Sequence, residues 1–312
     1  ATTDIYTLSL HDALPISGMD AKYLKPKPVF NILNIVALAF LATACIFPIV
    51  HVLALSLSTS TAAASGRVTL WPVDFTIQSY RFVTDTPAFG RAFAVSVQRV
   101  LLATPLNMLL TILVAYPLSR PKKQFLRRNF FVWFFLVTVL FSGGLIPWYM
   151  TIRLTGLIDK IWALILPSAL PVFNVILLVN FFRNVPGELE EAAYMDGAGH
   201  WTMLFRIYLP LSVPVLATVT LFVIVGHWNS WFDGLILMNS PARYPLQSYL
   251  QTIIINPDPK MLTERDLEIL KVINNRTAKA AQIFVAMLPI LVVYPFLQRY
   301  FTTGITLGSV KG

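Results

Sequence analysis

Long apolar segments limit the possible folds of this chain more strongly than any other feature of its sequence. A helix needs about 20 mostly apolar residues to cross the hydrocarbon core of a bilayer. Six segments approach or exceed this length: Phe30–Leu57, Phe93–Leu118, Phe130–Met150, Ile161–Phe182, Leu211–Gly226 and Ala278–Phe301. The fifth is the shortest, and we expect Leu209–Pro210 or His227–Trp228 to extend it. The sequence therefore predicts an all-α membrane protein with six transmembrane helices.

The composition argues against a soluble protein. Charged residues make up 12% of the 312 residues, whereas a soluble domain carries about 25%. So few charges leave too little polar surface to face water on all sides. Several of the apolar segments contain proline, which membrane helices tolerate because neighbouring groups satisfy the freed backbone atoms. The single cysteine, Cys45, lies in the first segment, where we expect a small packing residue.

The distribution of basic residues predicts the orientation in the membrane. Short cytoplasmic loops of membrane proteins are enriched in Lys and Arg. The densest cluster lies between the second and third segments, and Lys22, Lys25 and Lys27 precede the first one. The cluster consists of Arg120, Lys122, Lys123, Arg127 and Arg128. A nucleic-acid site is a poor alternative for a short hairpin at a membrane edge. With six crossings, both termini are predicted to be cytoplasmic, residues 183–210 form an inner loop and residues 229–277 an outer one.

The first eighteen residues differ from the rest of the chain. They contain no Lys or Arg, so they lack the basic start of a secretory signal peptide. Part of this stretch, "TLSLHDALPI", resembles one reading frame of a sequencing adapter. We expect residues 1–18 to be a non-native addition before Met19, with a genuine tail as the alternative. Residues 19–29 would then form the cytoplasmic N-terminus and residues 30–312 the membrane domain.

The inner loop at residues 183–210 is acidic, unlike its basic neighbours. Pro186 followed by acidic residues is typical of a helix N-terminus. Leu189, Ala192 and Ala193 are spaced to share one small apolar face, and Gly197 is positioned to end the helix. Such a helix suits close docking of a basic partner. An acidic loop that is simply solvated explains the same residues equally well.

The loop also carries a spaced motif that resembles the EAA loop of binding-protein-dependent ABC importer permeases. Seven positions match at the family's spacing: Glu191, Ala192, Ala193, Gly197, Ile207, Leu209 and Pro210. Further stretches, including "GHWNSWFDGL" and "YPFLQRYFTTGITLGSVKG", resemble the carbohydrate-import branch. Within that branch the chain is most similar to the maltose-type second permease subunit of the complex-polysaccharide and multiple-sugar systems. The resemblance covers most of the chain from about residue 30 and implies the type I ABC importer permease fold.

The resemblance implies a role for each part of the motif. In that family the EAA helix couples the permease to a separate ATPase. Glu191 would pair with a basic residue of that subunit, Ala192 and Ala193 would allow close approach, and Gly197 would make the turn. The distal positions Ile207, Leu209 and Pro210 would join the loop rigidly to the fifth helix. The implied partners are a second permease subunit, an ATPase dimer, an extracytoplasmic substrate-binding protein and the lipid of a bacterial cytoplasmic membrane, with no nucleic acid.

The chain shows no energy source of its own. It has no G-x-x-x-x-G-K-[ST] phosphate loop, so ATP and Mg would bind the partner ATPase and no cofactor is expected here. Ion-driven carriers bury ionisable groups in their bundles, whereas every Asp and Glu here lies outside the six segments. We expect Arg99 to extend toward the outer membrane surface. His51 and His227 are too few and too far apart to predict a metal site, and no segment pairs a nucleophile with a base for an intramembrane enzyme.

Candidate substrate contacts are weaker. The candidates among the polar residues within the segments are Gln98, Asn107, Asn174, Asn180 and Gln282, and the aromatic residues near the outer ends include Trp148, Tyr149, Trp228 and Trp231. Both sets have structural alternatives, because membrane Asn and Gln often bond between helices and Trp favours the interface. We select Gln98, Asn107, Asn174 and Asn180 as candidate path residues for a saccharide. A polyamine or glycerol phosphate in the same machinery, or a sensor that transports nothing, remain alternatives.

Overall fold

The computed structural model describes residues 28–252 and 275–309, with side chains to residue 296. The predicted N-terminal addition at residues 1–18, and most of the predicted cytoplasmic N-terminus, lie outside these ranges. The chain divides into two compact units, residues 1–51 and 52–312. The first unit contains most of α1 (Pro28–Ser56), a 29-residue helix without a charged side chain that is long and apolar enough to cross a membrane. Its bounds agree with the first predicted segment.

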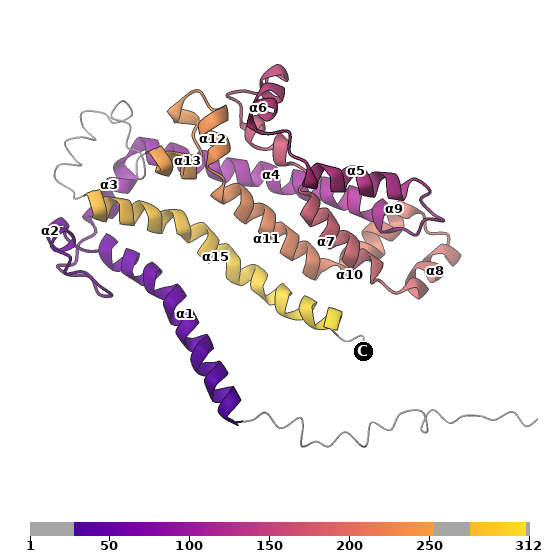
Figure 1. Ribbon diagram of the computed structural model, residues 1–312, viewed down its shortest axis with the longest axis horizontal. Helices are drawn as coiled ribbons and strands as arrows, with labels where there is room; N and C mark the ends of the chain where they lie inside the picture. The colour runs from indigo at the N-terminus through magenta and orange to yellow at the C-terminus, as the bar shows by residue number, and fades with distance from the viewer. Residues whose placement is uncertain (1–27, 253–274, 310–312) are drawn as a thin grey trace, which may run out of the picture. The chain divides into compact units, whose positions relative to one another are not determined.

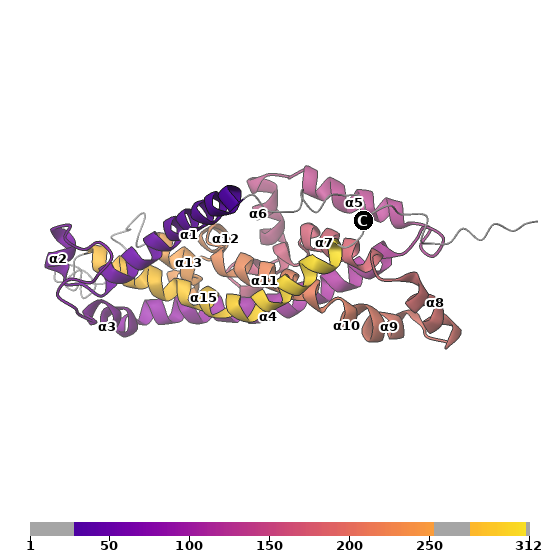
Figure 2. The same cartoon turned by 90° about the horizontal axis from the view of Figure 1, so that it is seen from below.

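The second unit is a bundle of helices built around α4 (Pro87–Ser119). This helix packs against α7 (Val172–Arg183) and α11 (Val213–Asn229), and α11 in turn packs against α15 (Asn275–Ser309) (Figures 1 and 2). α4 and α15 contain the second and sixth predicted segments. The fifth segment is extended at its end, through His227 and Trp228 to Asn229.

The third and fourth predicted segments each consist of two helical parts separated by a break, so neither is one continuous helix. The third forms α5 (Arg128–Leu140) and α6 (Leu145–Leu154), which are bent by 115°. The break falls at a glycine pair, and Gly144 has φ +85°, a value that L-residues avoid. The fourth forms two 3₁₀ turns, η2 (Ile161–Leu164) and η3 (Leu166–Ser168), before α7, with a bend of 46°.

The breaks change the number of helices that can span a membrane. Pro171 precedes α7 and disfavours helical backbone at the residue before it, which explains the second interruption. Within residues 28–252 and 275–309, three helices are long and apolar enough to cross alone, and up to six crossings result if each bent pair makes one span. The third bent pair joins the loop region to α11 and is described with the loop below.

Short helices pack at the other end of the bundle from the predicted inner loop. They are α2 (Ser60–Ala64), α3 (Gln78–Asp85), α12 (Phe232–Leu237), η5 (Pro241–Arg243) and α13 (Leu246–Leu250). Leu237 and Leu246 are completely buried. The first part of the predicted outer loop is therefore packed against the bundle, and residues 253–274 lie outside the described ranges.

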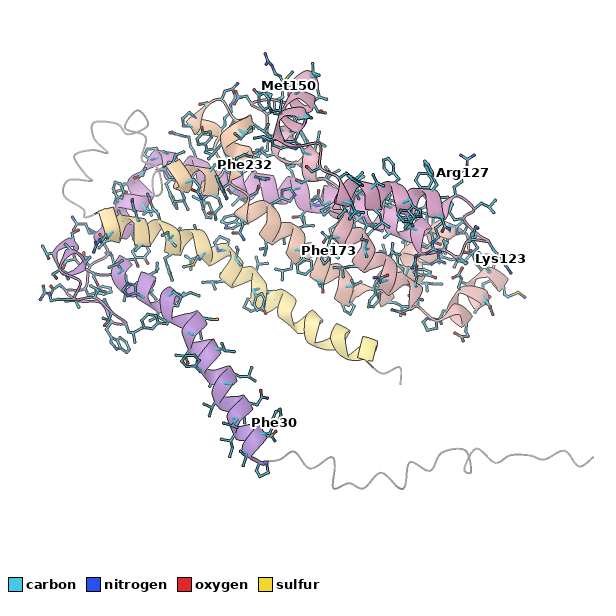
Figure 3. The ribbon with its side chains drawn as sticks, in the orientation of Figure 1. Phe30, Lys123, Arg127, Met150, Phe173 and Phe232 are labelled. Atoms are coloured by element: carbon cyan, nitrogen blue, oxygen red, sulfur yellow. The ribbon has the colours of Figure 1, made fainter. Side chains whose placement is uncertain are left out.

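The two larger apolar clusters form most of the core of this unit. One includes Leu164, Trp228 and Leu237 near α12, and the other includes Phe182 and Tyr208 near the acidic loop. We call the two ends of the bundle the α12 end and the loop end. Figure 3 places Lys123 and Arg127 of the basic cluster at the loop end, with Met150 and Phe232 at a distance from it.

Candidate functional site

The acidic loop is built around α8 (Gly187–Met195), a nine-residue helix. Pro186 is its N-cap, and Glu188 and Glu190 lie in the first turn, where the helix dipole favours negative charge. Gly197 follows the end of the helix with φ +76°. Its N–H donates to the Tyr194 carbonyl at 3.0 Å, and the next N–H, of Ala198, donates to the Ala193 carbonyl at 2.9 Å. These two bonds form a Schellman motif, so the predicted turn at Gly197 is present.

α8 divides the motif between two faces. Ala193 is buried in the core cluster at the loop end, and Glu190 is largely buried with 16% of its side chain exposed. Leu189, Glu191 and Ala192 are exposed. The predicted apolar face of the loop is therefore split, because Ala193 packs inward against its own chain while Ala192 points outward. The surface open to a partner includes Ala192, the acidic residues beside it and the exposed apolar side chains of Leu189 and Met195.

Glu190 is the acid that holds α8 to the bundle. Its carboxylate accepts hydrogen bonds from Arg120 Nη1 at 2.8 Å, Tyr208 Oη at 2.9 Å and Gln124 Nε2 at 3.0 Å. Burial alone raises the pKa of Glu190, but the hydrogen bonds from Gln124 and Tyr208 and the charge of Arg120 outweigh it. The pKa of Glu190 is thereby held below the usual range of a glutamate. Glu191 has no such partner among the described residues.

Arg120 occupies the centre of this cluster. It follows α4 directly, is 4% exposed, and lies between two tyrosine rings. Its guanidinium carbon is 4.7 Å from the ring centre of Tyr116 and 4.2 Å from that of Tyr208. A planar guanidinium between two rings gains cation–π attraction that an ammonium would not reproduce equally. One residue thus joins α4, α8 and the segment before α11.

The distal part of the motif lies on a bent connection. Ile207 belongs to the π-helical turn η4 (Leu204–Tyr208), which follows α9 (His200–Met203), while Leu209 and Pro210 belong to α10 (Leu209–Leu211). The chain then turns by 82° between His200–Leu211 and α11. Ile207 and Leu209 pack against the same core cluster as Ala193. The expected link to the fifth helix exists, but it is an elbow and not a straight continuation.

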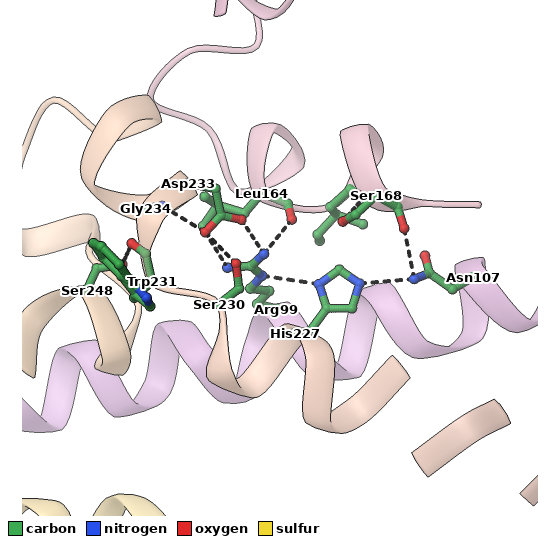
Figure 4. Close-up of polar contacts among 11 residues, drawn as sticks. Arg99, Asn107, Leu164, Ser168, His227, Ser230, Trp231, Asp233, Gly234 and Ser248 are labelled. Carbon is green, nitrogen blue, oxygen red and sulfur yellow. Dashed lines mark hydrogen bonds and ion pairs between the residues drawn. The ribbon is translucent and has the colours of Figure 1, made fainter. Parts of the chain in front are cut away.

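A second polar cluster lies toward the α12 end and centres on Arg99 of α4 (Figure 4). Arg99 Nη1 donates to Asp233 Oδ1 at 3.2 Å, and Nη2 contacts Oδ2 and donates to the Leu164 carbonyl at 3.0 Å. Arg99 Nε donates to Nδ1 of His227 at 3.2 Å. The side chain is only 2% exposed, so the expectation that Arg99 extends to the membrane surface is wrong. Asp233 lies outside the apolar segments, yet it neutralises a charge inside the bundle.

The predicted path residues have different surroundings. Asn107 is buried and bonds the Ser168 carbonyl at 3.2 Å and Nε2 of His227 at 3.0 Å. Asn174 is buried, whereas Gln98 and Asn180 are exposed. The structure thus brings Asn107 into the Arg99 cluster and does not gather the four residues into one site.

A cavity of about 610 Å³ lies beside Asp233. Trp148 and Phe232 line it together with Ser142, Thr151 and Ser230. Aromatic faces combined with hydroxyl and carboxylate groups are suited to a polar ligand with apolar ring faces. Trp228, by contrast, is buried, and its Nε1 donates to the Ala286 carbonyl at 3.0 Å. Across residues 28–252 and 275–309 no group of three His, Cys, Asp or Glu side chains is arranged to hold a metal ion.

Sequence reasoning missed Glu190 and Asp233. Both pair with arginines that are distant in sequence, 70 and 134 residues away respectively. Two signals were available in the sequence. One was a pair of arginines, one inside an apolar helix and the other directly after it, and the other was a second glutamate three residues before the buried Ala193. Neither signal identifies which acid pairs with which arginine, because that depends on how the helices pack.

The apolar helices, with an acidic loop at one end of their bundle, define a class of protein: a helical protein of the membrane. The sequence matches the family described as "Binding-protein-dependent transport system inner membrane component" over residues 88–307. The chain belongs to this family of multi-pass inner-membrane transport proteins.

Individual relatives agree over most of the chain. Protein LplC of Bacillus subtilis (strain 168) is 40% identical, over 91% of this chain and 95% of that protein. The polygalacturonan/rhamnogalacturonan transport system permease protein YtcP of the same organism is 37% identical, over 91% and 99%. A chain of the crystal structure of a bacterial ABC transporter involved in the import of the acidic polysaccharide alginate has a TM-score of 0.81. It is 31% identical and is matched over 96% of its length and 88% of this chain.

Proposed function

We propose that this chain is one of two permease subunits in an ATP-driven, binding-protein-dependent importer of saccharides. Residues 30–312 form the permease domain, each bent helix pair makes one crossing, and both termini face the cytoplasm. Two copies of an ATPase dock at the loop end, and an extracytoplasmic binding protein delivers the solute at the α12 end. ATP and Mg bind the ATPase.

One observation carries the proposal: α8 turns Glu190 and Ala193 inward and leaves Glu191 and Ala192 exposed. If the loop were only solvated, nothing would require α8 to be fixed to the bundle through Glu190 and Ala193. Nor would anything require Glu191 and Ala192 to be left together on its exposed side. A basic partner surface does, because it approaches closely over Ala192 and pairs with Glu191. Gly197 ends the helix, and Ile207, Leu209 and Pro210 lead from the docking helix into the elbow before α11.

A saccharide is supported by the relatives and by the cavity beside Asp233. The relatives' names include transport of polygalacturonan, and the similar solved structure imports alginate. Trp148 and Phe232 offer ring faces against which sugars stack, and Ser230 and Asp233 offer hydrogen-bonding groups. Of the four predicted path residues, Gln98 and Asn180 are the exposed ones and stay candidates for contact with the passing solute.

The experiment is affinity purification of the complex from its native membrane, combined with solute uptake. Glu191→Lys should lose the ATPase from the purified complex and abolish uptake, because it reverses the charge opposite a basic partner. Glu188→Lys is the matched control: it makes the same change at another exposed acid of α8, and it should retain more of both. Normal uptake by Glu191→Lys would exclude the assigned role of this residue.

The same preparation separates the other solutes and the sensor alternative. Uptake should be found with oligogalacturonate or maltodextrin, and not with a polyamine or glycerol phosphate. Uptake of only the latter solutes would replace the saccharide assignment while leaving the importer. A chain that purifies without an ATPase and moves none of these solutes would be a sensor or scaffold.

A further inference from the structure

We infer that Glu190 and Arg120 are positioning residues that fasten the ATPase-docking helix α8 to the end of α4, so that displacement of the loop moves α4. This inference rests on the proposed function, because it assigns the path by which the docked loop acts on the bundle. It concerns the acid that precedes the recognised motif and an arginine outside it. Nothing in the motif itself assigns a role to either residue.

Few side chains hold α8 in place. Of its nine residues only Ala193 is buried, and an isolated helix of this length is unstable in water. Glu190 supplies the polar attachment on the same inward face, one turn before Ala193. It receives three hydrogen bonds, from Arg120, Gln124 and Tyr208. Without this carboxylate, Ala193 is the one side chain of α8 whose burial still orients the helix.

The side chain of Arg120 is itself held in place by its neighbours. Its side chain is 5% exposed, and the rings of Tyr116 and Tyr208 enclose it on two sides. Arg120 also donates to the hydroxyl of Ser119 through Nη2 at 3.3 Å. A guanidinium held in this way transmits a displacement of Glu190 to the backbone of α4 and does not simply reorient in solvent.

The two adjacent acids of α8 have different surroundings. Glu191 is exposed and available to another subunit, whereas Glu190 is committed to its own chain. Two acids at consecutive positions on α8 therefore face different bodies. The first fixes the helix to the permease and the second presents it to the ATPase.

The test compares Glu190→Gln with Glu191→Lys and with Glu188→Gln in the full complex with its ATPase and binding protein. Three quantities are measured: the amount of ATPase that co-purifies, the rate of ATP hydrolysis, and uptake of oligogalacturonate or maltodextrin per ATP hydrolysed. We expect Glu190→Gln to retain the ATPase and to hydrolyse ATP. Uptake per ATP should fall by roughly fivefold or more, the lower range of measured coupling between sites. Glu188→Gln should resemble the wild type.

The ratio of uptake to hydrolysis distinguishes positioning from mere stability. A variant that only destabilises the complex lowers both rates together and leaves the ratio unchanged, and this result for Glu190→Gln would overturn the inference. Arg120→Lys should also lower the ratio, because it keeps the charge but loses the planar group between the rings of Tyr116 and Tyr208.

Three further outcomes are informative. If Glu190→Gln does not assemble, Tyr208→Phe decides, since it removes one bond to Glu190 and keeps the ring: a reduced ratio supports the inference and an unchanged one refutes it. If Glu191→Lys abolishes uptake while Glu190→Gln has a normal ratio, this inference fails and the proposed function stands. If Glu191→Lys transports normally, the docking role of the loop fails as well.

Discussion

The buried pair of Arg99 and Asp233 yields the sharpest stability prediction. Both carboxylate oxygens of Asp233 face the guanidinium of Arg99, which is 2% exposed, while the carboxylate itself is 17% exposed. Asp233→Asn leaves the shape of the site and removes its negative charge. The guanidinium then keeps the Leu164 carbonyl and His227 as neutral partners, and its charge is no longer balanced.

The expected loss in the free energy of unfolding follows from the burial of Arg99. Removing one partner of a buried ion pair costs about 3–5 kcal/mol. The introduced amide would still accept one hydrogen bond, and the partial exposure of this position lets water in, so we expect the lower value, about 3 kcal/mol. The entropy of unfolding is about 2.1 cal/mol/K per residue, or about 0.65 kcal/mol/K for a chain of 312 residues. The melting temperature should therefore fall by about 5 °C.

The assay is thermal unfolding of the purified permease in lipid nanodiscs at one fixed scan rate. The control is the double variant Arg99→Met with Asp233→Leu, which removes both charges and fills a similar volume. Because replacing a buried pair by apolar groups is often neutral, the double variant should melt close to the wild type and well above Asp233→Asn. A wild-type melting temperature for Asp233→Asn, or a double variant as unstable as the single one, would refute the reasoning.

Three further predictions concern glycines and pH. Gly197→Ala places a side chain at φ +76° with no atom within 4 Å of the new Cβ. It should lower the free energy of unfolding by about 1–2 kcal/mol through backbone strain alone, which faster proteolysis of the loop would show. Gly187→Ala, also in open space, is the control and should not change the stability. Gly234→Ala brings its Cβ to 2.1 Å from Ser248 Oγ; it should lower stability by about 1–3 kcal/mol, and Ser248→Ala should recover part of this. Because the pKa of Glu190 is lowered in the folded protein, its contribution is complete above the unfolded pKa of about 4.3 and is lost as pH falls through the lower folded value. The melting temperatures of wild type and Glu190→Gln should therefore converge only below about pH 4.

The sequence predicts the local features of the loop because they depend on short spacings. A glycine at the end of a short acidic helix is a local signal, and Gly197 lies at the end of α8 in a left-handed conformation. The burial of Ala193, by contrast, does not follow from short spacings. Spacing shows that Ala192 and Ala193 differ by about 100° around the helix, but only the position of the bundle decides which one is buried.

The interrupted segments show a second limit. Hydropathy measures only whether a stretch is apolar, and the third and fourth segments satisfy that condition throughout. Gly144 and Pro171 carried the information about the breaks. Because membrane helices often accept such residues inside a span, their presence alone does not fix a bend of 115° or 46°.

α4 connects the two polar clusters of the bundle. Arg120 at one end holds α8 through Glu190, and Arg99 on the same helix holds α12 through Asp233. The two arginines are 21 positions apart, or about 30 Å along a helix that rises 1.5 Å per residue, which is close to the thickness of a bilayer's hydrocarbon core. Each pair is largely buried, so neither releases its helix without leaving a charge unbalanced. We therefore expect a displacement at the loop end that moves α4 to reach α12 and the cavity beside Asp233 through these two pairs.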